Sequence, residues 1–502
     1  MRSKQAAKNV LSTILLQLII ALTGIYIPQL MISTYGSDIN GVVSSITQFI
    51  TYLGLVEAGI GSATMVALYV PLANNDKKAI NGVMRASRDF YYRSAAIFAA
   101  LVVGLAFLYP FFLTEDLDAS MVSWMILVLG GSSFIDYVFL GKYRMLLTAN
   151  QKGYIYTLIQ SVATILNSLI TIVMIEFKMD ILLVKSVATL MYLLRCPVVY
   201  YFIKKYYPYL NYKEQPNKDA LRQRWSALLH QITGVIVNNT DIVVLTVVLK
   251  NFAEISVYTV YNLIINSLVS LVESFCNGLS AGFGEVLALN DKELLRKSYS
   301  SYEYFYYMIM FIAYTCLGIL FIPFIQIYSK NFTDAVYVRP FTAILFTCMA
   351  LCRGIRTPAL TMIIAAGQYK ETRNAAVLEA VINIGVSLLL VRKYGINGVL
   401  IGTICSYLYR TVDVIIYTSK NIVVNTLKKS IWRLSHNIIT MVILMTVFQK
   451  LNVTPAGWLE WFLYACIVGV VCVLFYGIEN FLLESVEMKN TLNQIKRVVK
   501  RG

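Results

Sequence analysis

Long apolar runs recur along the whole chain, and they limit its fold more than any other feature. Each run is long enough for a helix to cross a hydrocarbon core about 30 Å thick. Only 14% of the residues are charged, against about 25% in ordinary globular domains. A β-barrel would need segments of about ten residues with alternating hydrophobicity, and the sequence lacks that pattern. The chain is therefore predicted to be an all-α polytopic membrane protein.

Charged breaks between the apolar runs predict fourteen transmembrane helices. The predicted spans are 10–34, 41–72, 90–113, 120–147, 154–176, 181–203, 226–249, 256–288, 303–328, 340–365, 374–391, 396–418, 434–449 and 457–480. The first span is too long for the core of a cleaved signal peptide, so it is interpreted as a retained helix.

Lysine and arginine orient these spans. With the N-terminus in the cytoplasm, the cytoplasmic segments hold about 30 of the 43 Lys and Arg residues and the external loops about seven. Both termini are therefore predicted to be cytoplasmic. The net charge of +16 then reflects topology and contact with anionic headgroups, and nucleic acid is not an expected partner.

The chain resembles itself at a shift of about 216 residues. LVEA at 55–58 returns as LVES at 271–274, and NDKKAI at 75–80 returns as NDKELL at 290–295. The same shift aligns Arg195 with Arg410. Each copy would hold six spans, an even number, so both copies would enter the membrane in the same orientation, as in other parallel-repeat transporters.

The repeat predicts the domain organisation. The expected parts are an N-terminal six-helix lobe at 1–203, a cytoplasmic linker at 204–225, a C-terminal six-helix lobe at 226–420, two additional helices at 421–480 and a basic cytoplasmic tail at 481–502. Two such lobes with short loops favour alternating access around a central cavity, and hence a transporter.

This organisation resembles the Wzx-type polysaccharide flippases of the MOP superfamily, which are related to MATE exporters and the lipid II flippase. FITYLGLVEAGIGSATMVALYVPLANND in the first copy and GINGVLIGTICSYLYR in the second carry the resemblance. The resemblance implies a protein of the bacterial inner membrane that moves an undecaprenyl-pyrophosphate-linked oligosaccharide to the outer leaflet. It also implies coupling to an H+ or Na+ gradient. Membrane lipids and a glycan polymerase are further expected partners.

Intramembrane charges are candidate sites by default, and a pyrophosphate suits arginine. Arg353 and Arg356 share a helix face and either line the cavity or reach headgroups. Gly354 and Pro358 beside them predict a local break in that helix. Lys142 and Arg144 are expected to anchor a helix end to headgroups, with cargo binding as the less favoured alternative.

Other polar residues complete the set of cavity candidates. They are Asp241, Asn238, Asn239, Arg195 and Arg410. The cluster around Asp241 either faces the cavity, where it could read sugar hydroxyls or carry a coupling ion, or holds two helices together. Arg410 could pair with Asp413 on its own helix. Asp136 aligns with Arg353 in the repeat, and the two could pair across the lobe interface.

Glu57, in YLGLVEAGIGSA, is a carboxylate in the middle of a predicted span, and Glu273 is its repeat mate. Placing such a charge at the bilayer centre costs roughly 2.5–3.5 kcal/mol on insertion scales. Both residues either titrate and couple transport to protons, or bond to neighbours within their own lobes while Gly54, Gly59 and Gly61 allow close packing. The second interpretation is slightly favoured.

Other functions remain open alternatives. A MATE-type multidrug or cation antiporter would share the fold. A membrane glycosyltransferase or polymerase would use the acidic pair Asp116 and Asp118 on an external loop to hold a metal. An ATP-driven pump is disfavoured because the sequence has no P-loop. No Cys/His cluster has metal spacing, and no cofactor, metal site or catalytic residue is predicted.

Overall fold

The computed structural model describes residues 2–113, 117–217, 224–280, 283–289, 291–368, 370–451 and 453–488. Side chains are described in these ranges except at residues 2–4, 6–7, 224–231, 233, 238, 274–280, 284–285 and 288. The acidic residue Asp116 of the glycosyltransferase alternative and the side chain of Asn238 lie outside this description.

All fourteen predicted spans coincide with helices. Thirteen helices in the described residues are long and apolar enough to cross a membrane. The remaining predicted span corresponds to α10 (Arg224–Leu249), in which the stretch Asn239–Leu249 is a shorter apolar helix. The described part of the chain contains no β-strand. The prediction of an all-α polytopic membrane fold is confirmed.

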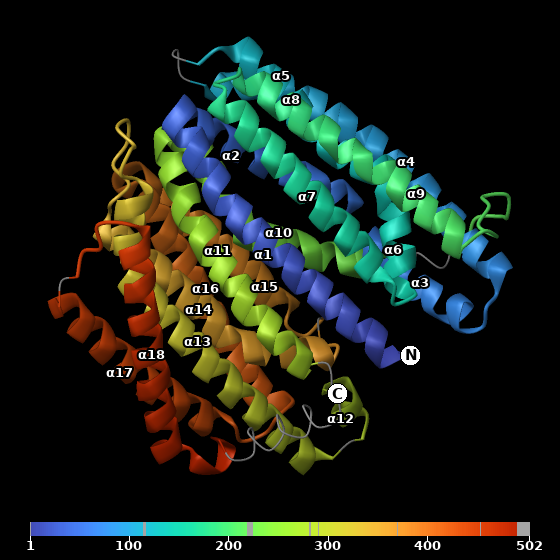
Figure 1. The fold of residues 1–502 in the computed structure, drawn as a ribbon. Helices are drawn as coiled ribbons and strands as arrows, with labels where there is room; N and C mark the ends of the chain where they lie inside the picture. The colour runs from blue at the N-terminus through green and yellow to red at the C-terminus, as the bar shows by residue number, and fades with distance from the viewer. Residues whose placement is uncertain are drawn as a thin grey trace. The chain divides into compact units, whose positions relative to one another are not determined.

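The chain divides into two compact units, Met1–Val260 and Tyr261–Gly502, and α11 (Phe252–Ser280) crosses the boundary. Before α10 and α11, the first unit contains α1 (Arg2–Tyr35), α2 (Ser37–Leu53), η1 (Gly54–Glu57), α3 (Ile60–Ala73), α4 (Lys77–Leu108), η2 (Tyr109–Phe112), α5 (Ala119–Ile135), η3 (Asp136–Leu140), α6 (Gly141–Ala149), α7 (Gly153–Glu176), α8 (Ile181–Met191), η4 (Tyr192–Leu194) and α9 (Arg195–Tyr206). Within this unit α8 packs against both α5 and α7, and α7 also packs against α1 (Figure 1).

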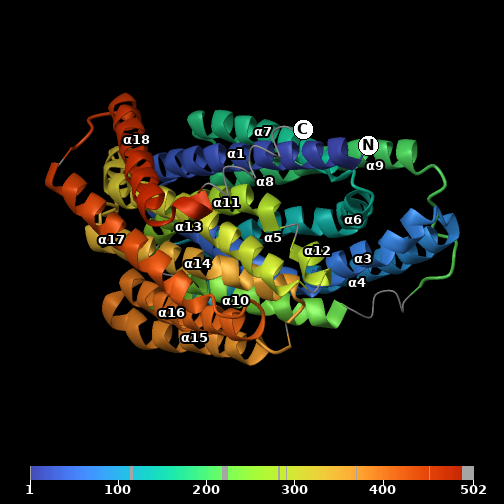
Figure 2. The same ribbon diagram turned by 90° about the horizontal axis from the view of Figure 1, so that it is seen from below.

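The second unit continues α11 with the remaining helices. They are α12 (Phe283–Ala288), α13 (Lys292–Tyr328), α14 (Pro340–Ala365), α15 (Arg373–Tyr394), α16 (Ile396–Asn421), α17 (Leu427–Leu451) and α18 (Trp458–Leu483). Here α16 packs against α14 and α15, while α13 packs against α14, α17 and α18 (Figure 2). The lobe boundaries inferred from the repeat stay a prediction.

The repeated NDK motif has a structural reason. Asp76 accepts hydrogen bonds from the backbone N–H groups of Lys78 and Ala79, at 3.0 and 2.9 Å, and so caps α4. Asp291 caps α13 in the same way, through two bonds of 3.0 Å. An aspartate N-cap satisfies backbone donors that the first turn of a helix leaves unpaired. The motif thus marks the start of a helix in each unit.

Three long helices of the first unit lose regular α geometry near their middles. The predicted span 41–72 is not continuous: α2 ends at Leu53, η1 is a 3₁₀ turn, and Gly59 (φ +83°) precedes α3. A π-helical turn, η3, separates α5 from α6, and a 3₁₀ turn, η4, separates α8 from α9. Such irregular turns often occur at functional sites. By contrast, α14 is continuous, so the break predicted near Pro358 is wrong.

A GxxxG sequence holds α16 close to α15. A Cβ atom added at Gly398 would lie 2.5 Å from the backbone oxygen of Leu390, and one at Gly402 would lie 2.3 Å from Oγ of Ser387. Glycine at both positions therefore lets the two backbones approach each other, as small residues do between membrane helices.

We expect Gly398→Ala to destabilise the protein by about 1–3 kcal/mol, because the new methyl group would push against backbone rather than a movable side chain. The measurement is thermal unfolding of the purified protein in detergent. Gly385→Ala, on α15, is the matched control, since no described atom lies within 4 Å of its added Cβ. Equal melting temperatures for the two variants would contradict the packing role of the GxxxG sequence.

Candidate functional site

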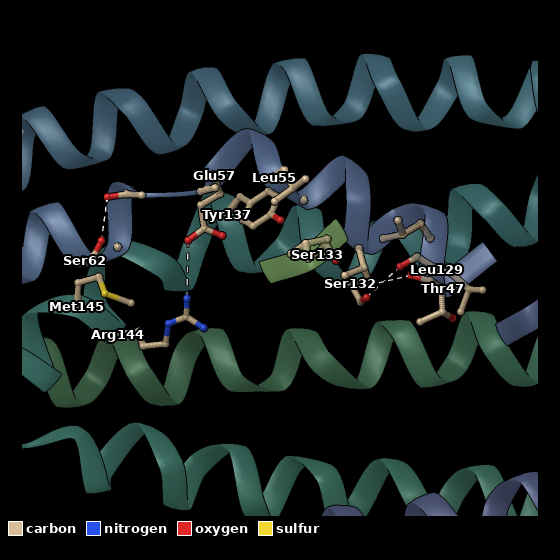
Figure 3. Close-up of a pocket in the computed structure, with 17 residues that line it drawn as sticks. Thr47, Leu55, Glu57, Ser62, Leu129, Ser132, Ser133, Tyr137, Arg144 and Met145 are labelled. Carbon is tan, nitrogen blue, oxygen red and sulfur yellow. Dashed lines mark hydrogen bonds and ion pairs between the residues drawn. The ribbon is translucent and has the colours of Figure 1, made fainter. Parts of the chain in front are cut away.

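A polar pocket of about 510 Å³ opens in the first unit (Figure 3). Its lining comes from the broken helix α2–η1–α3, from α5, η3 and α6, and from Val235 on α10. The polar side chains of the lining are Thr47, Thr51, Glu57, Ser62, Ser132, Ser133, Tyr137 and Arg144. Glu57 and Arg144 are the two charged residues among the lining residues.

Glu57 lies at the helix break, and its carboxylate has two partners. The Tyr91 hydroxyl donates a hydrogen bond of 2.9 Å to Oε1 of Glu57. The guanidinium of Arg144 lies 3.7 Å from the same oxygen. Figure 3 marks this ion pair with a dashed line. These contacts offset the cost of a carboxylate within a membrane-spanning segment. Glu57 therefore bonds to neighbours in its own part of the chain, as the favoured interpretation expected.

A smaller pocket of about 200 Å³ adjoins the first and shares Glu57, Ser133, Tyr137 and Arg144 with it. Asp136 lines this second pocket. Its Oδ1 accepts a hydrogen bond of 2.9 Å from Nη2 of Arg195. The two pockets thus form one polar region with two ion pairs.

Arg195 is buried, with a side chain that is only 4% exposed, and several protein groups bond to it. Besides Asp136, it donates to Oε1 of Gln160 and to the backbone oxygen of Tyr192, the latter at 3.2 Å. Its guanidinium also lies 4.5 Å from the ring centre of Tyr192. A buried arginine with its donors paired in this way is a fixed structural element that orients Asp136.

The irregular turns place these charges. Glu57 is the last residue of η1, Asp136 the first of η3, and Arg195 directly follows η4. A break in a membrane helix frees backbone groups and is tolerated where it is buried in protein or lines a water-filled cavity. The first unit therefore concentrates its backbone irregularities and its intramembrane charges in one region.

The burial of Lys142 does not fit the predicted headgroup anchoring, and cargo contact by Arg144 stays a prediction. Arg144 lines both pockets. Lys142 is buried, donates a 2.9 Å hydrogen bond to the backbone oxygen of Val138, and lies 4.8 Å from the ring centre of Tyr92. The sequence predicted both residues near a helix end, whereas they follow the π-helical turn η3 in the first turns of α6.

The second unit contains a related pair. Nη2 of Arg353 lies 3.4 Å from Oε1 of Glu273, and Nη1 lies at the same distance from Oδ1 of Asn266. A glutamate from the LVEA/LVES motif thus meets an arginine in both units. Asp136 and Arg353 each have an ion-pair partner within their own unit, and the suggested pair between them stays a prediction.

Arg356 and Arg410 share a buried carboxylate, that of Glu379 on α15. Arg356 bonds to Glu379 and lies 4.2 Å from the ring centre of Tyr407. Arg410 lies 3.6 Å from Glu379 and 2.5 Å from Asp413, so the intrahelical pair is confirmed. Arg356 is packed among protein groups rather than free at a helix end. Substrate contact by Arg356 stays a prediction.

The cluster around Asp241 forms a contact between helices in the first unit. Asp241 on α10 is buried and accepts a hydrogen bond of 2.8 Å from the Tyr258 hydroxyl on α11. This geometry fits the interpretation in which polar groups join two helices. Asn239 is partly exposed.

Solved structures with this fold are known transporters. An inward-facing multidrug resistance MATE family transporter of the MOP superfamily matches with a TM-score of 0.63 and 16% identity, over 82% of this chain and 98% of its own. The lipid II flippase MurJ, in an inward closed conformation, matches with a TM-score of 0.73 and 14% identity, over 94% of this chain and 99% of its own. An outward-facing MATE transporter matches with a TM-score of 0.57 and 15% identity, over 85% of this chain and 97% of its own.

At these identities the similarity establishes the fold: the chain has the fold of MATE transporters and of MurJ. No protein-family model and no curated protein sequence matches the chain.

Proposed function

We propose that the chain is a transporter that flips an undecaprenyl-pyrophosphate-linked oligosaccharide from the cytoplasmic to the outer leaflet during surface polysaccharide synthesis. The carrying observation is the fold match to MurJ, which extends over 94% of this chain. Transport would proceed by alternating access and be coupled to an ion gradient. The proposed location is the bacterial inner membrane, with both termini in the cytoplasm.

The polar region of the first unit supports a cargo with a large polar headgroup. A polyprenyl tail can remain in lipid, but a glycan cannot cross hydrocarbon without compensating hydrogen bonds. Glu57 and Arg144 line a pocket in a segment that is otherwise apolar enough to span a membrane. Retaining charged residues there is expensive unless they are paired or functional.

A MATE-type exporter of cationic drugs is the second candidate, because MATE transporters share the fold. A cationic cargo would favour a pocket with excess negative charge. The pocket lining instead carries one carboxylate and one guanidinium, Glu57 and Arg144. This balance disfavours a cation as cargo and makes the flippase the preferred proposal.

Deleting the gene should trap lipid-linked oligosaccharide on the cytoplasmic leaflet, because the headgroup cannot cross unaided. The measurement is mass spectrometry of lipid-linked intermediates combined with surface glycan staining, with a complemented strain as control. Normal surface glycan without a compensating paralogue would rule out the proposed function. Increased sensitivity to cationic drugs with normal glycan would favour the exporter.

A further inference from the structure

Four of the six hydroxyl groups that line the larger pocket are available to a ligand mainly as acceptors. Each of four hydroxyls donates its proton to a backbone oxygen of its own helix segment. These bonds are Thr47 to Val43 at 2.7 Å, Thr51 to Thr47 at 2.9 Å, Ser62 to Gly59 at 3.1 Å and Ser132 to Leu129 at 2.9 Å. A hydroxyl has one proton and two lone pairs, so these oxygens can still accept hydrogen bonds.

Arg144 supplies the complementary donor. Its side chain is 41% exposed and lines the pocket, so the exposed part of its guanidinium can donate to a ligand there. The pocket therefore presents several acceptors and one charged donor group.

Charge balance narrows the class of ligand further. Glu57 faces Arg144 at 3.7 Å, and Asp136 faces Arg195 at 2.9 Å. The formal charges of these four side chains sum to zero. A pyrophosphate accepts hydrogen bonds but donates none when fully ionised, so it would meet four hydroxyls whose protons are already donated to backbone, and the carboxylate of Glu57. An ammonium ligand donates but cannot accept, so it would meet the Arg144 guanidinium.

We infer that this pocket binds a neutral polyhydroxylated ring, a single sugar residue. A sugar hydroxyl both donates and accepts, which matches the hydroxyl wall and the Arg144 guanidinium together. The volume of about 510 Å³ lies within the range of about 300–1,000 Å³ typical of small-molecule sites. The assignment of that sugar to a lipid-linked oligosaccharide rests on the proposed function. The pyrophosphate would then be held by other residues than those of this pocket.

The test is saturation-transfer NMR on the full-length protein in lipid nanodiscs. The probes are methyl glycosides of glucose, galactose, rhamnose and N-acetylglucosamine, with inorganic pyrophosphate and tetraphenylphosphonium as competitors. At least one glycoside should receive saturation from the wild-type protein. Its signal should fall about fivefold or more in Thr47→Val/Thr51→Val and in Ser132→Ala/Ser133→Ala, because each double variant removes two hydrogen-bonding groups. Neither competitor should displace it.

Thr446→Val is the matched control. Thr446 donates a 2.7 Å hydrogen bond to the backbone oxygen of Val442 on α17, as Thr51 does to Thr47 on α2, but it is not among the residues that line the pocket. The glycoside signal with the Thr446→Val variant should equal the signal with the wild-type protein. The hydroxyl variants keep Glu57 and Arg144, so the ion pair that supports folding is preserved.

Three results would overturn the sugar site: no signal from any glycoside, an equal signal in wild type and both double variants, or displacement by pyrophosphate or tetraphenylphosphonium. Displacement would also identify the pocket as an anion or a cation site. If lipid-linked oligosaccharide is flipped but no glycoside binds, the sugar site fails and the proposed function stands. If glycosides bind but no lipid-linked oligosaccharide is flipped, the sugar site stands and the proposed function fails.

Discussion

Replacing Arg433 with alanine should destabilise the protein by about 3–5 kcal/mol, because it would leave buried carboxylates without their cation. Arg433 on α17 is 1% exposed. Nε and Nη2 of Arg433 bond to the two carboxylate oxygens of Glu484, both at 2.8 Å. Its Nη1 bonds to Glu303 of α13 and to the backbone oxygen of Ser300, both at 2.9 Å. This guanidinium therefore joins α17 to α13 and to the residues that follow α18.

Thermal unfolding in detergent would measure this loss. Lys429→Ala is the control, because Lys429 lies 2.6 Å from Glu487 but its side chain is 45% exposed. An exposed pair contributes at most about 1 kcal/mol. Adding Glu303→Gln and Glu484→Gln to the Arg433→Ala variant should recover much of the lost stability, since the unpaired charges are then removed. A loss no larger than that of the Lys429 variant would show that the cluster is not structural.

The pH dependence of stability should report on the same cluster. Burial alone would raise the pKa of Glu484, but the nearby His436, at 3.8 Å, and the hydrogen bonds from Arg433 outweigh burial and hold its pKa below the usual value of 4.5. A carboxyl whose pKa is lower in the folded state stabilises the fold above its unfolded pKa, and this stability is lost as pH falls through the folded pKa. The wild type should therefore lose stability in acid, and Arg433→Ala should lose less.

Arg144→Gln should lower the rate of flipping by about tenfold or more, which corresponds to about 1.4 kcal/mol. The substitution removes the guanidinium whose Nε faces no partner among the described residues. It also removes one of the two partners described for the Glu57 carboxylate, so that the Tyr91 hydroxyl remains. The measurement is transport of a lipid-linked oligosaccharide by protein reconstituted in vesicles, with the amount of folded protein determined in parallel.

A double variant separates the two roles of Arg144. Glu57→Gln/Arg144→Gln has no unpaired charge, so its thermal stability should return towards that of the wild type. Its transport should stay low if Arg144 contacts the cargo. Recovery of transport together with stability would mean that the pair only supports the fold. Lys142→Gln is a useful neighbour for comparison, because Lys142 is buried against Val138 and does not line either pocket.

Hydropathy predicted the helical architecture well, because a helix must be long and apolar to cross a bilayer whatever it packs against. The repeat predicted related features in both units: Asp76 and Asp291 begin helices, and Glu57 and Glu273 each face an arginine. The partner arginines, Arg144 and Arg353, were harder to assign. Each lies far along the chain from its glutamate, and helix packing brings the two together.

The irregular turns were the main feature that the sequence did not reveal. The sequence suggested that Gly54 and Gly59 allow close helix packing. In the structure, Gly59 has φ +83° and directly precedes α3, at the end of the interrupted segment. Glycine permits this conformation but does not require it. The π-helical turn at Asp136 has no glycine or proline within it. Side chains bond to backbone oxygens at both breaks: Ser94 on α4 donates to Val56, and Lys142 donates to Val138.

The sequence by itself determined the spans, the internal repeat and the presence of charges within the membrane segments, because these follow from local hydrophobicity and from comparison of the chain with itself. The tertiary structure alone decided which charges meet and where a polar pocket opens. Glu57 illustrates the difference: the sequence shows a carboxylate at an unfavourable depth, and only the folded unit supplies Tyr91, Arg144 and the helix break that make it tolerable. The physical reason is that pairing energy depends on distances across helices, which no local pattern encodes.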